Sequence, residues 1–520
     1  MTTASLAGLV IALLGWYTPR LVAATRFRWS SILLLDLAMP AALFALVAAL
    51  TARPFFAGVM TLAIGAAYAY ADRSKRLVLA EPIVFTDVFQ APDIFRHPEL
   101  ALPFPHKGRI AAGVLLGISF FILLFRWETM AWTWAGWHPL AALFAILATG
   151  WVMANPANRV LGHYLRTQRP TEDPFEDAAR LGPFATLLAY GILARSERST
   201  RQLAVARTHE GPSETSSRTK GLPPVVAIQC ESFFDARRLH PQLASLNLPT
   251  LDTCRAQGVQ WGRLSVPTWG ANTVRTEFAV LSGLEQSALG LDRFNPYHRF
   301  ARHPITSLAW KLKAQGYKTI CLHPFDRNFY GRNFVLPNMG FDEFIGEEAF
   351  AEADRVNSYV TDMETARVGC EILARESGPV FLFVITMENH GPWPSLTSME
   401  GSHVAGLPNL PADEREGLDR YLQSLENADK MLERFAHQLQ PDGLLAFYGD
   451  HLPSFPGSFK RLGLSDMRSD YLVWRAGAPG AAGPNSTPSN IDASSLGGLI
   501  LENLSPCRMT VTPPMKEANC

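Results

Sequence analysis

The fold class is indicated by the stretch Leu444-Leu445-Ala446-Phe447-Tyr448-Gly449-Asp450-His451, in which an apolar run ends directly in polar side chains. Short apolar runs bounded by turn residues are typical of buried strands. Three more runs have this form: Val225–Ile228 before Glu231, Thr319–Leu322 before His323, and Val380–Ile385 before Glu388, Asn389 and His390. Helical segments alternate with these runs, which predicts an α/β domain with a largely parallel central sheet over residues 222–505.

The four strand ends predict a shared site. Open α/β sheets build their sites at the carboxyl ends of strands, so the polar residues that follow the runs should converge on one crevice. Glu231 and the adjacent pair Asp450 and His451 offer oxygen and nitrogen ligands suited to Zn²⁺ or Mn²⁺. A metal bound there would lower the pKa of a coordinated hydroxyl and neutralise charge on a phosphoryl group. A capping or surface turn is the alternative interpretation of the Asp-His pair.

A candidate nucleophile lies in the segment Pro267–Phe278, where a turn is followed by a hydroxyl residue and an apparent helix that continues through Leu284. Thr273 would lie near the N-terminus of that helix, where free backbone N–H groups and the helix dipole favour a phosphate. Covalent catalysis by an activated hydroxyl is chemically reasonable at this position. The alternative is that Thr273 is an ordinary N-cap.

Residues 1–155 have a different composition, with long apolar runs that predict a transmembrane domain of about five helices. The 47 basic and 47 acidic residues of the chain cancel, so the net charge does not point to a nucleic-acid partner. The predicted spans are Ala4–Tyr17, Ser30–Leu50, Pro54–Ala71, Ile110–Phe125 and His138–Met153. Several approach the roughly 17 to 25 residues that a lipid bilayer requires, which makes the bilayer a partner of this domain.

Loop charges bear on the orientation of the C-terminal domain. With five spans, these basic residues lie on its side of the membrane: Arg20, Arg26, Arg28, Arg73, Lys75, Arg76, Lys107, Arg109, Arg159, Arg166 and Arg169. The positive-inside rule would then place the domain in the cytoplasm. A sixth crossing at Leu181–Ala194 would reverse the orientation, although so short a segment fits an interfacial helix at least as well.

Residues 156–221 are predicted to form a juxtamembrane helix and a linker, and residues 506–520 a tail. The linker is rich in Ser, Thr, Arg and Glu from Arg195 to Lys220, which favours a solvated tether. A second patch, Ala476–Ser495, is rich in Gly, Ala, Pro and Ser and predicts a surface loop. The six cysteines include no CxxC pair, which argues against a zinc-ribbon site.

Five motifs together resemble the lipoteichoic acid synthases, phosphoglycerol transferases of the alkaline phosphatase and sulfatase superfamily. In the order found in that family they are Glu231-Ser232-Phe233, the turn Asn272–Phe278, the segment His323–Arg332, Asn389-His390 and Gly449-Asp450-His451. The resemblance covers the whole catalytic part and extends to the helical anchor and the loop at Glu81-Pro82. One departure is Tyr330, where the family usually has Trp, and this departure leaves the acceptor open.

The resemblance implies a sulfatase-like fold that holds one divalent ion, manganese as is usual in the family, with zinc or magnesium as alternatives. The implied ligands are Glu231, Thr273, Asp450 and His451. The groups implied around the phosphoglycerol are His323, Tyr330, Arg332 and His390. Arg332 would fork onto phosphate oxygens, as guanidinium groups do.

The implied reaction has two steps. Thr273 would attack the phosphorus of phosphatidylglycerol, diacylglycerol would leave, and an acceptor hydroxyl on an envelope glycan or polymer would then take the phosphoglycerol group. His390 is the candidate that protonates the leaving alkoxide or steadies the phosphate charge, because histidine titrates in a useful range.

The resemblance also implies a multi-pass protein of the bacterial inner membrane whose catalytic domain faces the periplasm or the outside, against the loop charges. Two alternatives stay open: a phosphoethanolamine transferase of the same superfamily, and a catalytically inactive envelope scaffold. A sulfatase proper is disfavoured, because Thr273 is followed by Val274 and Arg275 and not by the cysteine-or-serine and proline pattern of sulfatases.

Overall fold

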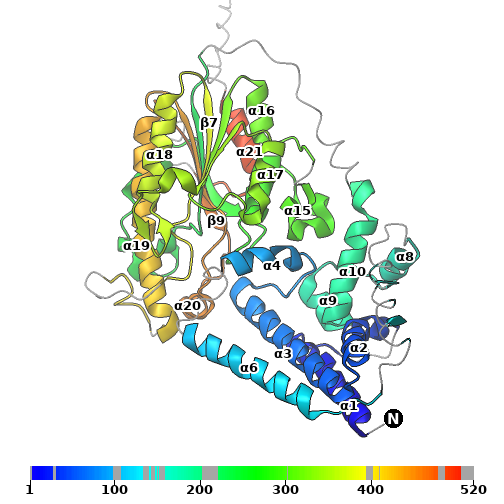
Figure 1. Ribbon diagram of the computed structural model, residues 1–520. Coiled ribbons are helices and arrows are strands. Elements are labelled where there is room, and N and C mark those ends of the chain that lie inside the picture. Colours follow the sequence, from blue (N-terminus) through cyan, green and yellow to red (C-terminus); the bar gives the residue numbers. More distant parts are fainter. Residues whose placement is uncertain are drawn as a thin grey trace, which may run out of the picture. The chain divides into compact units, whose positions relative to one another are not determined.

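The chain forms two compact units in the computed structural model (Figure 1). The helical unit comprises residues 1–208 and 286–296, and the sheet unit comprises residues 209–285 and 297–520. The segment 286–296 therefore belongs to the helical unit, although the sequence suggested one continuous catalytic domain. The structure describes residues 3–26, 31–97, 107–132, 159–201, 221–300, 303–393, 402–408, 410–477 and 487–504, with a few residues between 137 and 150.

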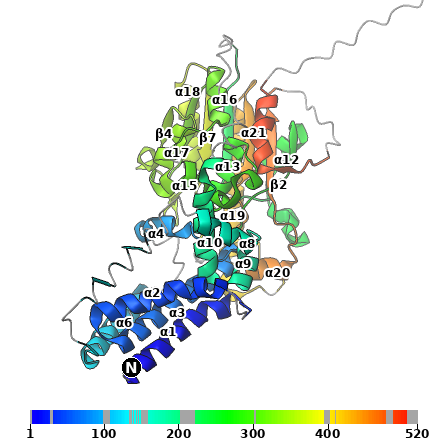
Figure 2. The same cartoon turned by 90° about the vertical axis from the view of Figure 1, so that its right-hand side faces the viewer.

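Among the described residues of the helical unit, three helices are long and apolar enough to cross a membrane: α1 (Thr3–Val22), α2 (Ser31–Thr51) and α3 (Pro54–Leu79). They correspond to the first three predicted spans. The fourth predicted span lies in α6 (Lys107–Trp127), whose apolar part is shorter. Helices α1, α2, α3 and α6 lie side by side in both views (Figures 1 and 2). Most of the fifth predicted span, His138–Met153, lies outside the described residues.

Glycines let α1 and α3 approach each other closely. The contact is made by Gly8 and Gly15 on α1 and by Gly58 and Gly65 on α3, so each backbone packs against the other. A Cβ atom added at Gly15 would lie 2.7 Å from the carbonyl oxygen of Thr61. Small residues at such crossings are the usual means by which membrane helices associate through van der Waals contact.

Gly15→Val is expected to destabilise the helical unit, because the added atoms overlap the backbone of α3. Overpacking of this kind costs about 1–3 kcal/mol, which thermal unfolding of the detergent-solubilised protein would detect as a lower Tm. Gly117→Val is the matched control, because a Cβ atom at Gly117 on α6 meets nothing within 4 Å. Equal Tm values for the two variants would contradict the close α1–α3 contact.

A buried ion pair joins the membrane-type helices to the juxtamembrane helix α10 (Pro183–Ser196). Arg20 lies 2.5 Å from Asp36, and Asp36 also accepts a hydrogen bond from the backbone N–H of Ala185, 3.0 Å away, at the start of α10. Tyr190 on α10 is fully buried. This helix therefore packs within the helical unit and is not among the described helices suited to a sixth crossing.

The remaining described helices of this unit are α4 (Asp87–Arg96), α8 (Arg159–Thr167), α9 (Pro174–Leu181) and the short α14 (Gln286–Leu289), while α15 (Pro296–Phe300) begins at the boundary of the sheet unit. Most of the predicted tether Arg195–Lys220 lies outside the described residues, but α10 continues into it as far as Ser196.

The sheet unit contains an eight-stranded sheet in the order β10-β2-β9-β8-β1-β7-β3-β4. Its strands are β1 (Val225–Cys230), β2 (Gln260–Ser265), β3 (Lys318–Leu322), β4 (Glu343–Ile345), β7 (Val380–Ile385), β8 (Leu444–Gly449), β9 (Ser469–Arg475) and β10 (Ile491–Asp492). The central strands β8, β1, β7 and β3 are parallel neighbours, and they are the four predicted strands. Among the described strands of this sheet, only β9 pairs antiparallel with its neighbours. The largely parallel sheet is thus confirmed.

Helices cover the sheet on both faces, as Figure 1 shows. The core on one face includes alternate residues of the central strands and the apolar sides of α18 (Asp362–Arg375) and α19 (Ala412–Gln438). On the other side α13 (Val274–Ser282), α16 (Leu308–Ala314) and α21 (Ala493–Glu502) contact one another. In the described part of the sheet unit, the other helices of at least seven residues are α12 (Pro249–Gln257), α17 (Arg332–Asn338) and α20 (Pro456–Leu462). Because helices cover both faces of the central strands, β1, β7 and β8 are buried along their full length.

The predicted surface loop Ala476–Ser495 is wrong over its last part. Ile491 pairs with Leu264 as β10, and α21 begins at Ala493. A strand of two residues is too short to show an alternating pattern. The prediction therefore followed the glycine, alanine and proline content of the segment, which is typical of a loop.

Candidate active site

The polar residues that follow the central strands lie at one edge of the sheet. Glu231 follows β1, His323 follows β3, and Asp450 and His451 follow β8, with all three strands parallel. His390 comes five residues after the end of β7. This arrangement places these residues where open α/β sheets build their sites, at the carboxyl ends of parallel strands.

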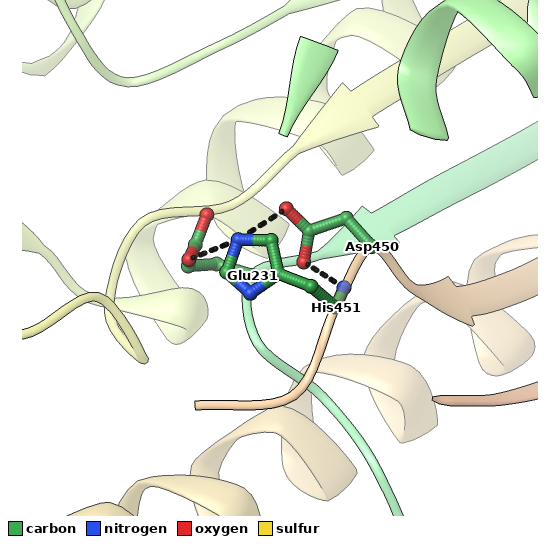
Figure 3. A group of neighbouring side chains, drawn as sticks. All are labelled: Glu231, Asp450 and His451. Carbon is green, nitrogen blue, oxygen red and sulfur yellow. Dashed lines mark hydrogen bonds and ion pairs between the residues drawn. The ribbon is translucent and has the colours of Figure 1, made fainter. Parts of the chain in front are cut away.

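Glu231, Asp450 and His451 form a buried cluster that could hold a metal ion, with one candidate ligand atom of each within 4.8 Å of the others. Figure 3 shows both carboxylates directed at the same imidazole nitrogen. His451 Nε2 lies 3.3 Å from Asp450 Oδ2 and 3.6 Å from Glu231 Oε1. His451 Nδ1 lies 3.1 Å from the carbonyl oxygen of Leu452, which favours the tautomer whose Nε2 carries a lone pair.

This donor set fits a divalent cation. Asp450 Oδ2 and His451 Nε2 are buried and have no hydrogen-bond partner among the described residues. Burial, and next the neighbouring carboxylate of Glu231, raises the pKa of Asp450 to about 7. A cation bound between the two carboxylates would satisfy the unpaired atoms and offset the repulsion between buried like charges. Carboxylate and imidazole ligands suit zinc and manganese.

Thr273 immediately precedes α13, but its side chain does not cap that helix. The hydroxyl instead interacts with the carboxylate of Asp450, where it works against the rise of that group's pKa. A second contact fixes the same helix to the cluster, because Thr276 Oγ1 donates to the carbonyl oxygen of Asp450 over 2.7 Å. The structure therefore disfavours the ordinary N-cap and places the hydroxyl of Thr273 beside the candidate metal ligands.

Arg332 is fully buried and makes an ion pair with Glu277, also on α13. The distances are 2.8 Å from Nη2 to Oε2 and 3.2 Å from Nε to Oε1. Burial works against the charge of Arg332, but the carboxylate of Glu277 outweighs it and raises the pKa of the guanidinium. The N–H groups on Nε and Nη2 of Arg332 therefore bind the carboxylate of Glu277. They are not available for the bidentate contact with a phosphate that the sequence predicted.

His323 Nε2 lies 3.2 Å from Arg332 Nη1, and its Nδ1 lies 3.2 Å from the carbonyl oxygen of Ile385. Burial, and next the charge of Arg332, lowers the pKa of His323 well below its usual value, so the imidazole is neutral at pH 7. With Nδ1 as donor, Nε2 accepts from Arg332. Arg332 then uses three of its five N–H groups on described residues and keeps two for an anion.

Tyr330 and His390 line the same region. The guanidinium carbon of Arg332 lies 5.4 Å from the centre of the Tyr330 ring, and the charge of His390 contributes to the pKa of His323. His390 Nδ1 contacts the carbonyl oxygen of Gly391, and the hydroxyl of Tyr359 lies 3.3 Å away. His390 Nε2 has no hydrogen-bond partner in the described part of the chain, which leaves it available to a ligand.

Backbone strain accompanies these residues. Ser232 beside Glu231, Asn272 beside Thr273, and Tyr330 itself have φ values of 53°, 65° and 57°. Residues other than glycine rarely adopt this region, and such strain tends to gather at functional sites.

Glu277 has no role in the sequence prediction, although it lies inside a motif that was quoted. Tyr297 and Gln229 also donate hydrogen bonds to it, the latter over 3.3 Å, and its side chain is fully buried. The signal in the sequence was the spacing: Glu277 follows Thr273 by four residues, which places the two side chains on the same face of a helix. A single sequence cannot show that a distant arginine turns toward that position.

Known proteins resemble this chain over both units. The family model described as Sulfatase matches residues 223–495. A capsular polysaccharide biosynthesis protein, RkpI, of Rhizobium meliloti is 30% identical over 82% of this chain and 78% of its own length. A lipoteichoic acid synthase of Staphylococcus saprophyticus is 27% identical over 32% of this chain and 26% of its own length.

Among solved structures, the integral membrane lipooligosaccharide phosphoethanolamine transferase EptA of Neisseria meningitidis aligns with a TM-score of 0.53. The alignment covers 95% of this chain and 94% of EptA at 12% identity, which shows a shared fold. The resemblance to lipoteichoic acid synthases is confirmed at the level of the superfamily. Because the family model matches more than half of the chain and its motifs meet at one edge of the sheet, this protein belongs to the sulfatase family.

Proposed function

We propose that this protein is a membrane-anchored transferase that moves phosphoglycerol from phosphatidylglycerol to an envelope glycan. The observation that carries the proposal is that Thr273 does not cap its helix, while its hydroxyl interacts with Asp450, one of the candidate metal ligands. The resemblance to a lipoteichoic acid synthase supports the phosphoglycerol donor, and the resemblance to a capsular polysaccharide protein supports a glycan acceptor.

In the first step the Thr273 oxygen forms a bond to phosphorus while the bond from phosphorus to the diacylglycerol oxygen breaks. The threonine proton passes to solvent, and His390 gives a proton to the departing alkoxide through its unpartnered Nε2. The two N–H groups that Arg332 keeps, together with Tyr330, hold the phosphoglycerol, and neutral His323 orients Arg332. In the second step an acceptor hydroxyl bonds to phosphorus and gives its proton to His390, while the Thr273 oxygen leaves and takes a proton from solvent.

Glu231, Thr273, Asp450 and His451 would hold one divalent ion, and manganese is our assignment. Such an ion lowers the pKa of the threonine hydroxyl and neutralises charge on the phosphoryl oxygens. The anchor places the site at the membrane that contains the donor, which raises the donor's effective concentration. We further propose the inner membrane as the location, with the sheet unit outside the cytoplasm, as in the family that the motifs resemble.

Chelation with EDTA is expected to abolish diacylglycerol release, and added Mn²⁺ to restore it. A metal that binds only the folded chain stabilises it by about 2.7 kcal/mol at one hundred times its Kd, so Tm should rise with Mn²⁺. Asp450→Asn should lose this rise. Full activity of the chelated protein, with metal analysis confirming that no ion remains, would refute the metal assignment.

The donor is tested with purified full-length protein and vesicles that contain headgroup-labelled phosphatidylglycerol or phosphatidylethanolamine. Release of diacylglycerol from phosphatidylglycerol supports the proposal. Turnover of phosphatidylethanolamine alone would move the protein to the phosphoethanolamine transferases, and no turnover of either lipid would favour an envelope scaffold.

A further inference from the structure

A polar pocket of about 450 Å³ lies along α19, outside the residues assigned above. Its lining residues are Glu388, His403, Arg420, Gln423, Ser424, Glu426 and Asn427. Arg420, Gln423 and Asn427 follow one another at the three- and four-residue spacing that places side chains on one face of a helix. The volume falls within the roughly 300–1,000 Å³ of small-molecule sites.

The strand end that carries the lining residue Glu388 reaches the candidate active site, because Thr386 Oγ1 accepts from the backbone N–H of Glu231 over 3.1 Å. Glu388 is buried and precedes His390 by two residues. Its Oε1 accepts from Asn427 Nδ2 over 2.7 Å, and its Oε2 accepts from the backbone N–H of Asp362 over 2.7 Å. Burial, then the charge of Glu388 and to a smaller extent that of Glu231, raises the pKa of Asp362. The backbone of Asp362 is therefore bonded to a residue that lines the pocket.

The lining indicates which ligand could bind. Arg420 and Gln423 are half-buried and have no hydrogen-bond or ion-pair partner among the described residues. The carboxylates of Glu388 and Glu426 offset the charge of Arg420, so the pocket is not the cationic site that a phosphate requires. Among the described residues, no Phe, Tyr, Trp or aliphatic side chain lines it, which disfavours a lipid chain. Amide, carboxylate, hydroxyl and guanidinium groups instead match a neutral ligand with many hydroxyls.

We propose that this pocket, at Glu388, Arg420 and Gln423, binds a neutral sugar unit of the acceptor glycan. The pocket holds the glycan so that one of its hydroxyls can reach the phosphoglycerol on Thr273. The volume exceeds what glycerol alone would fill, which favours a sugar ring over a further phosphoglycerol unit. The acceptor role of the pocket rests on the proposed transferase function, whereas the binding of a sugar does not.

Binding is measured first and does not depend on catalysis. Saturation-transfer NMR of a neutral glucan oligosaccharide is recorded with full-length Thr273→Ala protein in detergent, and then with Arg420→Ala and Gln423→Ala added singly. We expect a glucan signal that falls about tenfold with either substitution. Arg434→Ala, at an exposed position of the same helix, is the matched control and should leave the signal unchanged. No signal, or a signal equal in all variants, overturns the proposal.

Transfer is measured second, with Thr273 restored and phosphatidylglycerol vesicles as donor. The ratio of label on the glucan to diacylglycerol released should fall about tenfold in Arg420→Ala and stay constant in Arg434→Ala. A constant ratio in Arg420→Ala overturns the acceptor role. Absence of diacylglycerol release by the wild type, with glucan binding intact, would refute the proposed donor and leave the sugar site standing.

Discussion

Thr273→Ala is expected to lower diacylglycerol release from phosphatidylglycerol by at least about three orders of magnitude, because removal of a covalent nucleophile leaves only binding and electrostatic stabilisation. In the wild type, headgroup label should be trapped on the protein after acid quenching, and mass spectrometry should place it on the peptide that contains Thr273. Both the release and the trapped label should disappear in the variant.

Thr273→Ser provides the control for this experiment. It keeps a hydroxyl in the position that reaches Asp450 and should retain measurable release and trapping. Unchanged circular dichroism and Tm in Thr273→Ala would exclude unfolding as the cause of the loss. Wild-type release without any trapped label, even at short times, would argue for direct attack by water or acceptor and against the covalent step.

The central sheet was predictable because its four middle strands are buried on both faces and therefore appear as continuous apolar runs. Each run also ends where a polar residue begins, so Glu231, His323, Asp450 and His451 could be placed at one edge from the sequence. The outer strands were not predicted. Gln260–Ser265 is only partly buried and carries no apolar run, and Ile491–Asp492 is too short to show a pattern.

The contacts within the site were less predictable than its position. The position of Thr273 beside Asp450 depends on how the α13 N-terminus is placed against the end of β8, where Thr276 Oγ1 donates to the carbonyl oxygen of Asp450, and this placement arises from tertiary packing. Likewise, the orientation of Arg332 toward Glu277 is set by a fold that brings together residues 55 positions apart in the chain. Periodicity and motif spacing report local structure, so they indicated which residues matter but not which partner each one meets.

Glu277→Gln is expected to destabilise the sheet unit by about 3–5 kcal/mol, because it leaves the buried charge of Arg332 without its partner. Denaturant unfolding followed by intrinsic fluorescence measures this change. In Glu277→Gln/Arg332→Met the unpaired charge is gone, so much of the lost stability should return. Diacylglycerol release should stay low in the double variant, since Arg332 holds the phosphoglycerol. This divergence separates the two roles: if activity returned with stability, Arg332 would serve the fold alone, whereas a Glu277→Gln protein as stable as the wild type would show that the buried charge is compensated by another group.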